Sequence, residues 1–455
     1  MQSITLALYS LLMWCAQPIL RMKLRLRGRK EPGYLTQMDE RFGLYAHLNT
    51  EQKREQASTS ASANAPLIWV HAVSLGETRA ATVLVTELRK QIPGMRLLLT
   101  SGTATGRAEG KALLQAGDVH VWQVWDTPGA VRRFLQRFQP HIGILMETEL
   151  WPNMARQCAA RHIPLTIANA RMSEKSYRNT SVFAGLAKAA YSSLAAVWAQ
   201  STDDAMRFTM LGAVHVHVYG NLKFDATVDT TQLQLGQKLA QGYNIITLAS
   251  SRAGEEAMFL ESIQKFIKNQ PIGGINTAYT AIKNIANTVW MIVPRHPQRF
   301  AEVAQLIELY GFNVLRRSQL QDTENSAWQT LQDGNTVLLG DSMGEMALYY
   351  GMSRVALLGG SFEPLGGQNL IEAAACGCPV VMGPSTFNFA KAAQLSLQAG
   401  ASVQVQTMQQ ALQAAKDWVQ NNEALHRAQA AAVNFANAHQ GAAAKTASAV
   451  VKLLR

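Results

Sequence analysis

Short apolar runs alternate with helical periodicity along most of the chain, which is the pattern of a parallel α/β protein. In the first half, apolar runs predict strands at 67–70, 96–100, 119–124, 142–146, 165–169, 195–199 and 214–218. Amphipathic helical patterns fill the intervals, for example over 78–90, 127–138 and 202–211. A polar stretch, 225–242, then separates this half from a second alternating series.

The second series predicts further strands and a helical end. The strands fall at 244–249, 289–293, 312–316, 336–339, 355–358, 379–382 and 402–405. Residues 408–455 are Ala-rich and helical, and 269–287 is predicted to be an irregular insertion. The chain is therefore expected to form two Rossmann-like α/β domains, at 31–228 and 229–455, facing a central cleft.

Residues 1–30 differ from the rest and are predicted to be a membrane anchor with a basic flank. Residues 4–20 are mostly apolar and uncharged, and six basic residues follow before the first acid, Glu31. These are Arg21, Lys23, Arg25, Arg27, Arg29 and Lys30. A secretory signal has its positive charge before the apolar stretch, so the reverse order indicates an uncleaved anchor with a cytoplasmic flank. The apolar run is short and contains Pro18, which leaves a spanning helix and an interfacial helix as alternatives.

Net charge and cysteine content limit the kinds of partner and metal site that the chain is expected to have. The formal net charge is +11, and because much of it lies in the basic flank we expect a local anionic partner, such as a membrane face, and no nucleic acid. Hydrophobic residues make up 48% of the chain, enough for large cores. The four cysteines are predicted to be reduced and structural, because the Cys376-Gly-Cys378 pair has no second pair or nearby His to complete a zinc site. The other two are Cys15 and Cys158.

The first candidate for chemistry is Glu77, in Ser74-Leu-Gly-Glu77. It falls in the first turn of a predicted helix just beyond a strand end, which is where ligands sit in open α/β sheets. A helix N-terminus favours the ionised carboxylate that a general base requires. The alternative is a capping box, in which Ser74 and Glu77 only satisfy backbone donors.

Two further candidates follow in the same half. Glu147 and Glu149 come after the strand at 142–146 and would share a face of an extended chain. The alternative is that one of them caps the helix that begins near Trp151. Lys223 follows the last predicted strand, and it could neutralise a phosphate or a sugar carboxylate or be an ordinary solvated lysine.

In the second half, three strand-to-helix turns carry polar groups. Pro294-Arg-His-Pro297 holds Arg295, which can bind a phosphate or carboxylate with two parallel bonds, and His296, which is a ligand group or a turn residue. The turn 359–372 is rich in glycine, and Gly366 and Gly367 are expected to offer backbone N–H groups to a phosphate. Its Glu372 could accept hydrogen bonds from ribose hydroxyls.

The third turn, Asp341 to Met346, also carries an acid, and three such turns together predict a nucleotide site. Each turn alone is more often plain capping. The phosphates would meet backbone amides and Arg295 and no metal, because the only adjacent Asp pair, Asp203-Asp204, starts a helix. The chain lacks a Gly-x-Gly-x-x-Gly after a strand and a Walker A motif, so a dinucleotide dehydrogenase and a P-loop enzyme are disfavoured.

Six stretches together resemble the 3-deoxy-D-manno-octulosonic acid (Kdo) transferases of lipopolysaccharide assembly. They are Val-Ser-Leu-Gly-Glu (73–77), Met-Glu-Thr-Glu-Leu-Trp-Pro-Asn (146–153), Gly-Asn-Leu-Lys-Phe-Asp (220–225), Val-Pro-Arg-His-Pro (293–297), Met-Gly-Glu (343–345) and Gly-Gly-x-Asn-Leu-Ile-Glu (366–372). The resemblance implies an inverting GT-B glycosyltransferase that needs no metal or other cofactor. Its donor would be CMP-Kdo and its acceptor the lipid A precursor, lipid IVA, on the cytoplasmic side of the inner membrane, where anionic lipids would meet the basic flank.

The same resemblance assigns roles to individual residues. It implies that Glu77 is the general base and that Glu147 and Lys223 stabilise the transition state. The implied CMP-Kdo site comprises Pro294, Arg295, Met343, Gly344, Glu345, Asn369, Leu370, Ile371 and Glu372. Two positions depart from the family pattern, because Gln368 and Arg252 stand where the family usually has histidine.

Two alternatives remain open from the sequence. One is another GT-B transferase that uses a UDP-sugar on a lipid-linked acceptor. The other is a peripheral membrane protein that binds anionic glycolipid and keeps an inactive nucleotide domain. The presence of Glu77, Glu147 and Lys223 disfavours the second.

Overall fold

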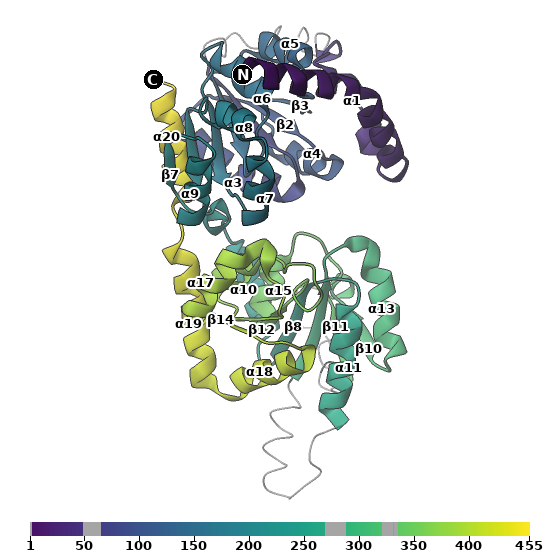
Figure 1. Ribbon diagram of the computed structural model, residues 1–455. Coiled ribbons are helices and arrows are strands. Elements are labelled where there is room, and N and C mark those ends of the chain that lie inside the picture. Colours follow the sequence, from purple (N-terminus) through teal and green to yellow (C-terminus); the bar gives the residue numbers. More distant parts are fainter. Residues whose placement is uncertain (1, 49–64, 269–287, 321–330, 332–334) are drawn as a thin grey trace, which may run out of the picture. The chain divides into compact units, whose positions relative to one another are not determined.

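The chain folds into two compact units (Figure 1). The computed structural model describes residues 2–48, 65–268, 288–320, 331 and 335–455, so the predicted insertion at 269–287 lies outside the described residues. The first unit comprises Met1–Ala226 and Gln440–Arg455, and the second comprises Thr227–His439.

The first unit is built on a parallel seven-stranded sheet in the order β3-β2-β1-β4-β5-β6-β7. Its strands are β1 Leu67–Ala72, β2 Arg96–Ser101, β3 Val119–Trp122, β4 Ile142–Met146, β5 Leu165–Ala170, β6 Ala196–Ala199 and β7 Val216–Val218. The prediction of a parallel sheet is confirmed, and each predicted strand in this half is present with ends shifted by at most two residues. The strand order reverses between β1 and β4, which is the crevice where such sheets bind ligands.

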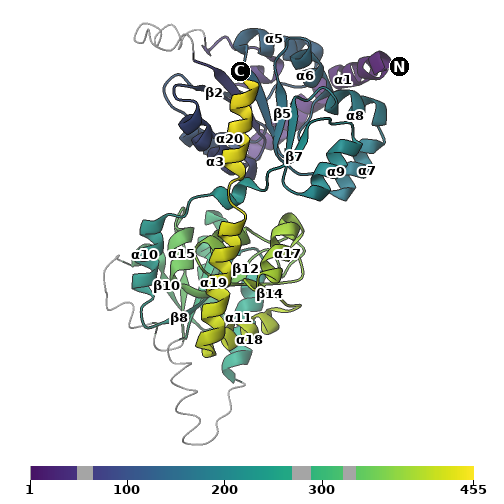
Figure 2. The ribbon, with the colours of Figure 1, turned by 90° about the vertical axis from the view of Figure 1, so that its left-hand side faces the viewer.

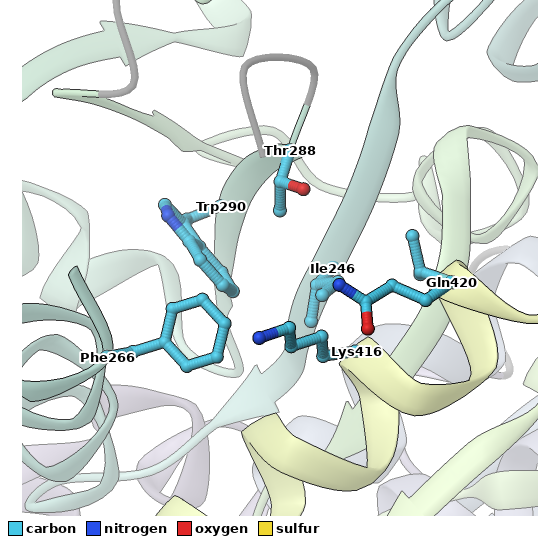
Figure 3. Close-up of a pocket in the computed structure, with 7 residues that line it drawn as sticks. Ile246, Phe266, Thr288, Trp290, Lys416 and Gln420 are labelled. Carbon is cyan, nitrogen blue, oxygen red and sulfur yellow. The ribbon is translucent and has the colours of Figure 1, made fainter. Parts of the chain in front are cut away.

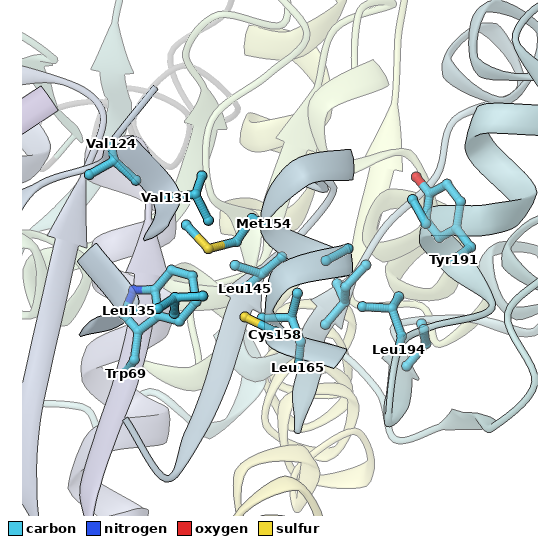
Figure 4. Packing of buried hydrophobic residues seen from close by; sticks show 14 of the residues in the cluster. Trp69, Val124, Val131, Leu135, Leu145, Met154, Cys158, Leu165, Tyr191 and Leu194 are labelled. Atoms are coloured by element: carbon cyan, nitrogen blue, oxygen red, sulfur yellow. The ribbon is translucent and has the colours of Figure 1, made fainter. Parts of the chain in front are cut away.

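Alternating side chains along these strands fill a core on each face of the sheet. On β1, Trp69 packs on one face while Ile68 and Val70 pack on the other, as the period-two alternation of a strand requires. Figure 4 shows the first of these cores, where Trp69 and Leu145 meet Met154 and other helix residues. Burial on both faces explains why these strands are continuous apolar runs.

Nine described helices surround this sheet. They are α1 Gln2–Lys30, α3 Leu75–Gln91, α4 Ala104–Gly110, α5 Pro128–Phe138, α6 Pro152–Ala159, α7 Glu174–Ser181, α8 Ala184–Tyr191, α9 Thr202–Met210 and α20 Ala442–Leu453. Short 3-10 turns join some of them, including η1 Pro32–Leu35, η2 Met38–Phe42 and η4 Leu222–Asp225. Within α1, the segment Ile4–Arg29 is long and apolar enough to cross a membrane, by length and composition alone.

The position of α20 corrects the domain assignment made from the sequence, which placed all of 229–455 in the second domain. Ala442, Ala447 and Val450 of α20 are fully buried in the core of the first unit, where the helix packs beside α3 (Figure 2). Asp225 fixes its start by accepting hydrogen bonds from the N–H groups of Gly441 and Ala443, the latter at 2.7 Å. The apolar face of α20 thus covers the first sheet although the helix follows the second in sequence.

The second unit repeats the architecture, with a parallel seven-stranded sheet in the order β10-β11-β9-β8-β12-β13-β14. Its strands are β8 Asn244–Ser251, β9 Thr288–Pro294, β10 Asn313–Arg316, β11 Thr336–Leu339, β12 Ser353–Leu358, β13 Val380–Met382 and β14 Ser402–Gln404. The strands predicted for this half are likewise present, and the strand order reverses between β8 and β12.

Helices cover both faces of the second sheet. They are α10 Thr230–Leu239, α11 Glu255–Lys268, α13 Phe300–Leu309, α15 Met346–Met352, α16 Leu370–Ala375, α17 Ala390–Gln398, α18 Met408–Gln420 and α19 Asn422–Ala438. Helices α11, α13 and α18 pack on the face that carries Leu248 and Ile292, and α10 and α15 pack on the face that carries Ile245 and Met291. The two units are therefore both Rossmann-like, as predicted.

Candidate functional site

In the first unit, the predicted carboxylates gather where the strand order reverses. Glu77 follows β1 and Glu147 follows β4, and these two strands are neighbours in the sheet. Parallel strands place their carboxyl ends at one edge, so both side chains start from the same crevice.

Glu77 forms part of the capping box that the sequence left as an alternative to catalysis, but its backbone donor is Val73 and not the N-cap Ser74. The Val73 N–H donates to Glu77 Oε2 at 2.9 Å, and the Ser74 hydroxyl donates to Glu77 Oε1 at 2.9 Å. In return, the Glu77 N–H donates to Ser74 Oγ at 3.4 Å. These bonds hold the carboxylate in one orientation at the start of α3.

Glu77 is also suited to acid–base chemistry, because its pKa is raised above the ordinary value for a glutamate. Burial raises the pKa of Glu77 to about 7, and the hydrogen bond from the Val73 amide opposes that rise. The neighbouring carboxylates of Glu147 and Glu149 raise the pKa further. A carboxylate with a pKa near neutrality is suited to proton transfer at physiological pH.

The backbone at Glu147 differs from the sequence prediction. Glu147 and Glu149 were expected to share a face of an extended chain, but Glu147 has φ +59° and lies in a turn. The turn is held by the Glu147 N–H, which donates to the Ala168 carbonyl at 3.0 Å, and by the Arg171 N–H, which donates to the Glu147 carbonyl at 3.3 Å. A left-handed conformation at a non-glycine residue costs free energy and is concentrated at functional sites.

Glu149 lies close enough to Glu77 to affect its pKa. Burial raises the pKa of Glu149 itself. Glu147 and Glu149 both raise the pKa of Glu77, although they do not share a face of an extended chain as predicted.

Lys223 also belongs to this cluster, although it lies in η4, which follows the edge strand β7. Its Nζ lies 3.9 Å from Glu147 Oε1, and its side chain is only 23% exposed, so the alternative of an ordinary solvated lysine does not hold. Asn221 Oδ1 accepts the Lys223 N–H at 3.0 Å, and Asn169 Oδ1 accepts the Leu222 N–H at 3.1 Å.

Asn169 is a residue that the sequence analysis missed. It lies in β5 with φ +53°, and its amide ties η4 to the sheet. Nothing in a strand sequence distinguishes an asparagine with this role, except that Asn is one of the few residues that tolerate a left-handed φ.

In the second unit, the turns after β8 and β9 form a basic cluster. Burial lowers the pKa of His296, and the positive charges of Arg252, Arg295 and Arg299 lower it further, so these arginines lie near one imidazole. The Arg295 N–H donates to the Ser251 carbonyl at 3.0 Å, which ties the two turns together. Arg252, which departs from the family pattern, thus adds a cation to this cluster.

Two buried carboxylates hold these turns in place, and the sequence analysis did not identify them. Glu255 is fully buried at the start of α11 and accepts the N–H groups of Arg252 at 2.9 Å, Gly360 at 2.7 Å and Phe362 at 3.0 Å. It therefore joins the turn after β8 to the turn after β12, across the point where the strand order reverses.

Its neighbour Glu256 joins the end of β8 to the turn after β9. Glu256 is fully buried and accepts the Ser251 hydroxyl at 2.7 Å and the Arg299 guanidinium at 2.6 and 3.3 Å. The available signal was Glu-Glu at a helix start next to Ser-Arg-Ala-Gly, which local sequence cannot distinguish from simple capping.

The glycine turn after β12 differs from its prediction. Gly366 and Gly367 were expected to present free N–H groups to a phosphate, but Gly366 N–H donates to Ser385 Oγ at 2.9 Å and Gly367 N–H donates to the Gly360 carbonyl at 2.7 Å. Both have positive φ, which lets the turn fold back so that Gly367 reaches Gly360 and Gly366 reaches Ser385.

The helix that follows this turn carries the next predicted residues. Asn369 is the N-cap of α16, and its Oδ1 accepts the Ile371 N–H at 3.2 Å. Leu370 and Ile371 are buried, while Glu372 and Arg295 both act electrostatically on the buried hydroxyl of Tyr350. The structure thus brings Arg295 and the start of α16 to one neighbourhood.

The turn after β11 carries Met343, Gly344 and Glu345. Met343 is exposed and Gly344 has φ +80°, whereas Glu345 forms an ion pair with the buried Arg317 at 3.0 Å. The Ser342 hydroxyl also donates to Glu345. Glu345 therefore joins this turn to Arg317 and Ser342.

The described residues outside these two clusters give no further candidate for a functional site. A small pocket lies at the amino-terminal ends of β8 and β9, lined by Ile246, Thr288, Trp290, Phe266, Lys416 and Gln420 (Figure 3), away from the predicted site residues at the carboxyl ends. Among the residues that the structure describes, no cluster of three or more His, Cys, Asp or Glu side chains could hold a metal ion. All four cysteines, which lie in described segments, are free, and only Cys15 is exposed.

Comparisons with known proteins give a consistent result. The family model described as 3-Deoxy-D-manno-octulosonic-acid transferase (kdotransferase) matches residues 36–226. The 3-deoxy-D-manno-octulosonic acid transferase of Bordetella pertussis is 40% identical over 400 residues, covering 86% of this chain and 89% of that protein. The protein of the same name from Haemophilus influenzae is 31% identical over 422 residues, covering 91% of this chain and 90% of that protein.

Solved structures share the fold at low sequence identity. A glycosyltransferase from Rickettsia africae superposes with a TM-score of 0.54 at 14% identity, covering 86% of this chain and 99% of that chain. Anabaena Alr3699/HepE in complex with UDP also gives a TM-score of 0.54, at 12% identity and with the same coverage of both chains.

Proposed function

Because the chain belongs to the Kdo transferase family of glycosyltransferases, we propose that it transfers Kdo from CMP-Kdo to the lipid A precursor, lipid IVA. The observation that carries this proposal is the carboxylate cluster at the β1–β4 crevice, in which Glu77 has a pKa of about 7. That cluster offers a base of suitable strength where an α/β sheet binds its ligand.

Glu77 is the proposed general base. It takes the proton from a primary hydroxyl of the acceptor as that oxygen attacks the anomeric carbon of Kdo, and the bond from that carbon to the CMP phosphate breaks. A single displacement inverts the configuration and leaves no covalent intermediate. The bonds from Val73 and Ser74 keep the carboxylate aimed while it accepts the proton.

Glu147 and Lys223 are proposed to stabilise the transition state. Kdo carries its own carboxylate, and the ammonium of Lys223 is suited to bind it and hold the sugar in place during the displacement. The Glu147 carboxylate, 3.9 Å from that ammonium, keeps it in the crevice. The strained turn at Glu147 supports a role of this kind.

The donor is proposed to bind the second unit. Pro294 and Arg295 would meet the phosphate, together with Met343 to Glu345 and Asn369 to Glu372. Negative charge grows on the departing CMP phosphate, and the cluster of Arg252, Arg295 and Arg299 around His296 supports an anion site there. This leaving-group stabilisation by fixed cations is proposed to need no metal.

The proposed location is the cytoplasmic side of the inner membrane. The apolar part of α1 would associate with lipid, and the basic residues from Arg21 to Lys30 would attract anionic head groups by ~1 kcal/mol each near the surface. A lipid-linked acceptor could then reach the enzyme while its lipid part stays in the bilayer.

The deciding experiment is mass spectrometry of lipid IVA incubated with the purified full-length protein, freshly made CMP-Kdo and EDTA. A gain of one or more Kdo units supports the donor, the acceptor and the metal independence together. Intact lipid IVA and intact CMP-Kdo, also in a metal-supplemented control, would reject the proposal and favour a screen of UDP-sugars.

A further inference from the structure

Helix α1 lies against the first unit along its length. Its buried and half-buried side chains recur every three or four residues and include Leu6, Tyr9, Met13, Leu20, Leu24 and Gly28. That spacing defines one face of a helix, so a single face of α1 is in contact with protein from near its start to near its end.

Specific contacts fix this face at both ends. Near the start, the Ser10 hydroxyl lies 3.0 Å from Asn153 Oδ1, and Tyr9 hydrogen-bonds to the buried carboxylate of Asp126. Near the end, the Arg21 guanidinium lies 4.1 Å from the centroid of the Phe42 ring. A helix that crossed the bilayer away from the unit would give up these polar and aromatic partners.

The start of α1 is also joined to the segment that follows the loop of Glu147 and Glu149. Asn153, in the first turn of α6, donates from Nδ2 to the Asp126 carbonyl at 2.7 Å, and its own N–H donates to the Asp126 carboxylate at 2.9 Å. Residues 147–151, which include Glu147 and Glu149, lead directly into this turn. The helix is thus a structural part of the first unit.

The opposite face of α1 is apolar and exposed. Ile4, Leu8, Leu11, Ile19, Met22 and Leu26 are each more than half exposed, from 53% for Leu26 to 65% for Ile19. We call these six residues the outer stripe. A continuous apolar surface of this length marks an interaction site, and the basic residues Arg21 to Arg29 beside its end match it to an anionic lipid surface.

We infer that α1 lies in the plane of the membrane and does not span it. The outer stripe enters the boundary between head groups and acyl chains, the inner face stays docked on the first unit, and both ends of the helix remain on the cytoplasmic side. This inference deepens the proposed membrane location and depends on that location, but it does not depend on the transfer reaction.

The first test is the side of the membrane on which each end of α1 lies. In a full-length Cys15→Ser background, only the three buried native cysteines remain, and a single new cysteine is placed by Ser3→Cys or Arg29→Cys. Inverted inner-membrane vesicles, whose cytoplasmic face is outward, are treated with a membrane-impermeant maleimide. We expect both cysteines to be labelled in intact vesicles to the extent reached in detergent. Labelling of Ser3→Cys only after detergent, with Arg29→Cys labelled throughout, would overturn the inference.

The second test measures binding of the purified full-length protein to phosphatidylcholine vesicles that contain phosphatidylglycerol. For Leu8→Glu with Leu11→Glu we expect partitioning to fall by roughly tenfold or more per leucine, since each apolar side chain leaves the lipid. Val214→Glu is the matched control, because Val214 is 68% exposed in the first unit and lies outside the outer stripe. Unchanged partitioning of the double variant would contradict the role of the stripe. Neither test reads transfer, so a failed transferase assay leaves both results interpretable.

Discussion

Glu147 and Lys223 form an ion pair in the first unit, with 3.9 Å between Glu147 Oε1 and Lys223 Nζ, although they follow different strands, β4 and β7. This separation is too long for a direct hydrogen bond. The Glu147 carboxylate nevertheless holds the ammonium within ion-pair distance, which fits the role proposed for Lys223 beside the carboxylate of Kdo.

Removal of this ammonium should slow the reaction more than it weakens donor binding. For Lys223→Ala we expect kcat to fall by roughly 10² to 10³, the loss typical of one preorganised charge donor, with little change in the affinity for CMP. Steady-state kinetics and calorimetric titration with CMP measure the two effects. Lys188→Ala, at an exposed position in α8, is the control and should behave like wild type. A change in CMP affinity alone would contradict the assignment.

Replacement of Glu77, the proposed base, should remove transfer and keep the fold. Glu77→Gln retains a side-chain oxygen for capping but cannot accept a proton, so we expect kcat/KM to fall by roughly 10² to 10⁴. The measurement is the rate of Kdo incorporation, with thermal unfolding as a check on stability. Glu87→Gln, in the same helix, should be unaffected. Near-normal turnover of Glu77→Gln would show that another group is the base.

The activity should depend on pH through the same carboxylate. The pKa of Glu77 is raised to about 7 by burial, and the base acts only when ionised. We therefore expect kcat/KM to be level above pH 7 and to fall about tenfold for each unit below it. The raised pKa has a second consequence, because ionising the buried acid costs stability as the pH rises from its unfolded-state pKa towards 7. Glu77→Gln should lack that loss, and a wild-type activity profile that stays flat down to pH 5 would contradict this assignment.

Donor binding should depend on Arg295, the arginine proposed to bind the phosphate. Arg295→Ala removes one charged partner, for which we expect CMP affinity to fall by roughly 1.5 to 3 kcal/mol with little effect on the melting temperature. Calorimetric titration with CMP measures it. Arg354→Ala, exposed near the amino end of β12, should bind CMP normally. Equal affinity in both variants would place the phosphate elsewhere.

Glu255 should matter for both stability and donor binding. Its carboxylate accepts three backbone N–H groups from two turns, and a glutamine amide cannot accept all of them. For Glu255→Gln we expect a loss of about 1 to 3 kcal/mol in the free energy of unfolding, together with weaker CMP binding. Denaturant titration of Glu255→Gln beside Glu261→Gln, an exposed position on the same helix, measures the first effect. A stable variant with normal CMP binding would mean that the two turns hold themselves together.

Much of the fold follows from the sequence because strands buried on both faces must be continuous apolar runs. Runs such as 67–70 and 142–146 therefore identified strands whose ends the structure shifts by at most two residues. The amphipathic pattern of 442–453 identified a helix but not its partner, because an apolar face does not say which sheet it covers. Only the buried Ala442, Ala447 and Val450 show that α20 belongs to the first unit.

The candidate site was less predictable, because its geometry depends on contacts between distant segments. The left-handed turn at Glu147 results from bonds to Ala168 and Arg171, which local sequence cannot reveal. Gly366 and Gly367 were predicted to donate to a phosphate, but their N–H groups donate to Ser385 Oγ and the Gly360 carbonyl. Local sequence does not distinguish Glu255 and Glu256 from ordinary helix-start acids, because their partners lie on other turns of the second unit.

The return of α20 to the first unit also sets an order of completion during synthesis. The second unit is one continuous segment, Thr227–His439, and all of it leaves the ribosome before α20 does. The first unit lacks Ala447 and Val450 in its core until α20 has been synthesised. Although domains often mature from the amino terminus onwards, here the unit that is begun first is the last to be finished.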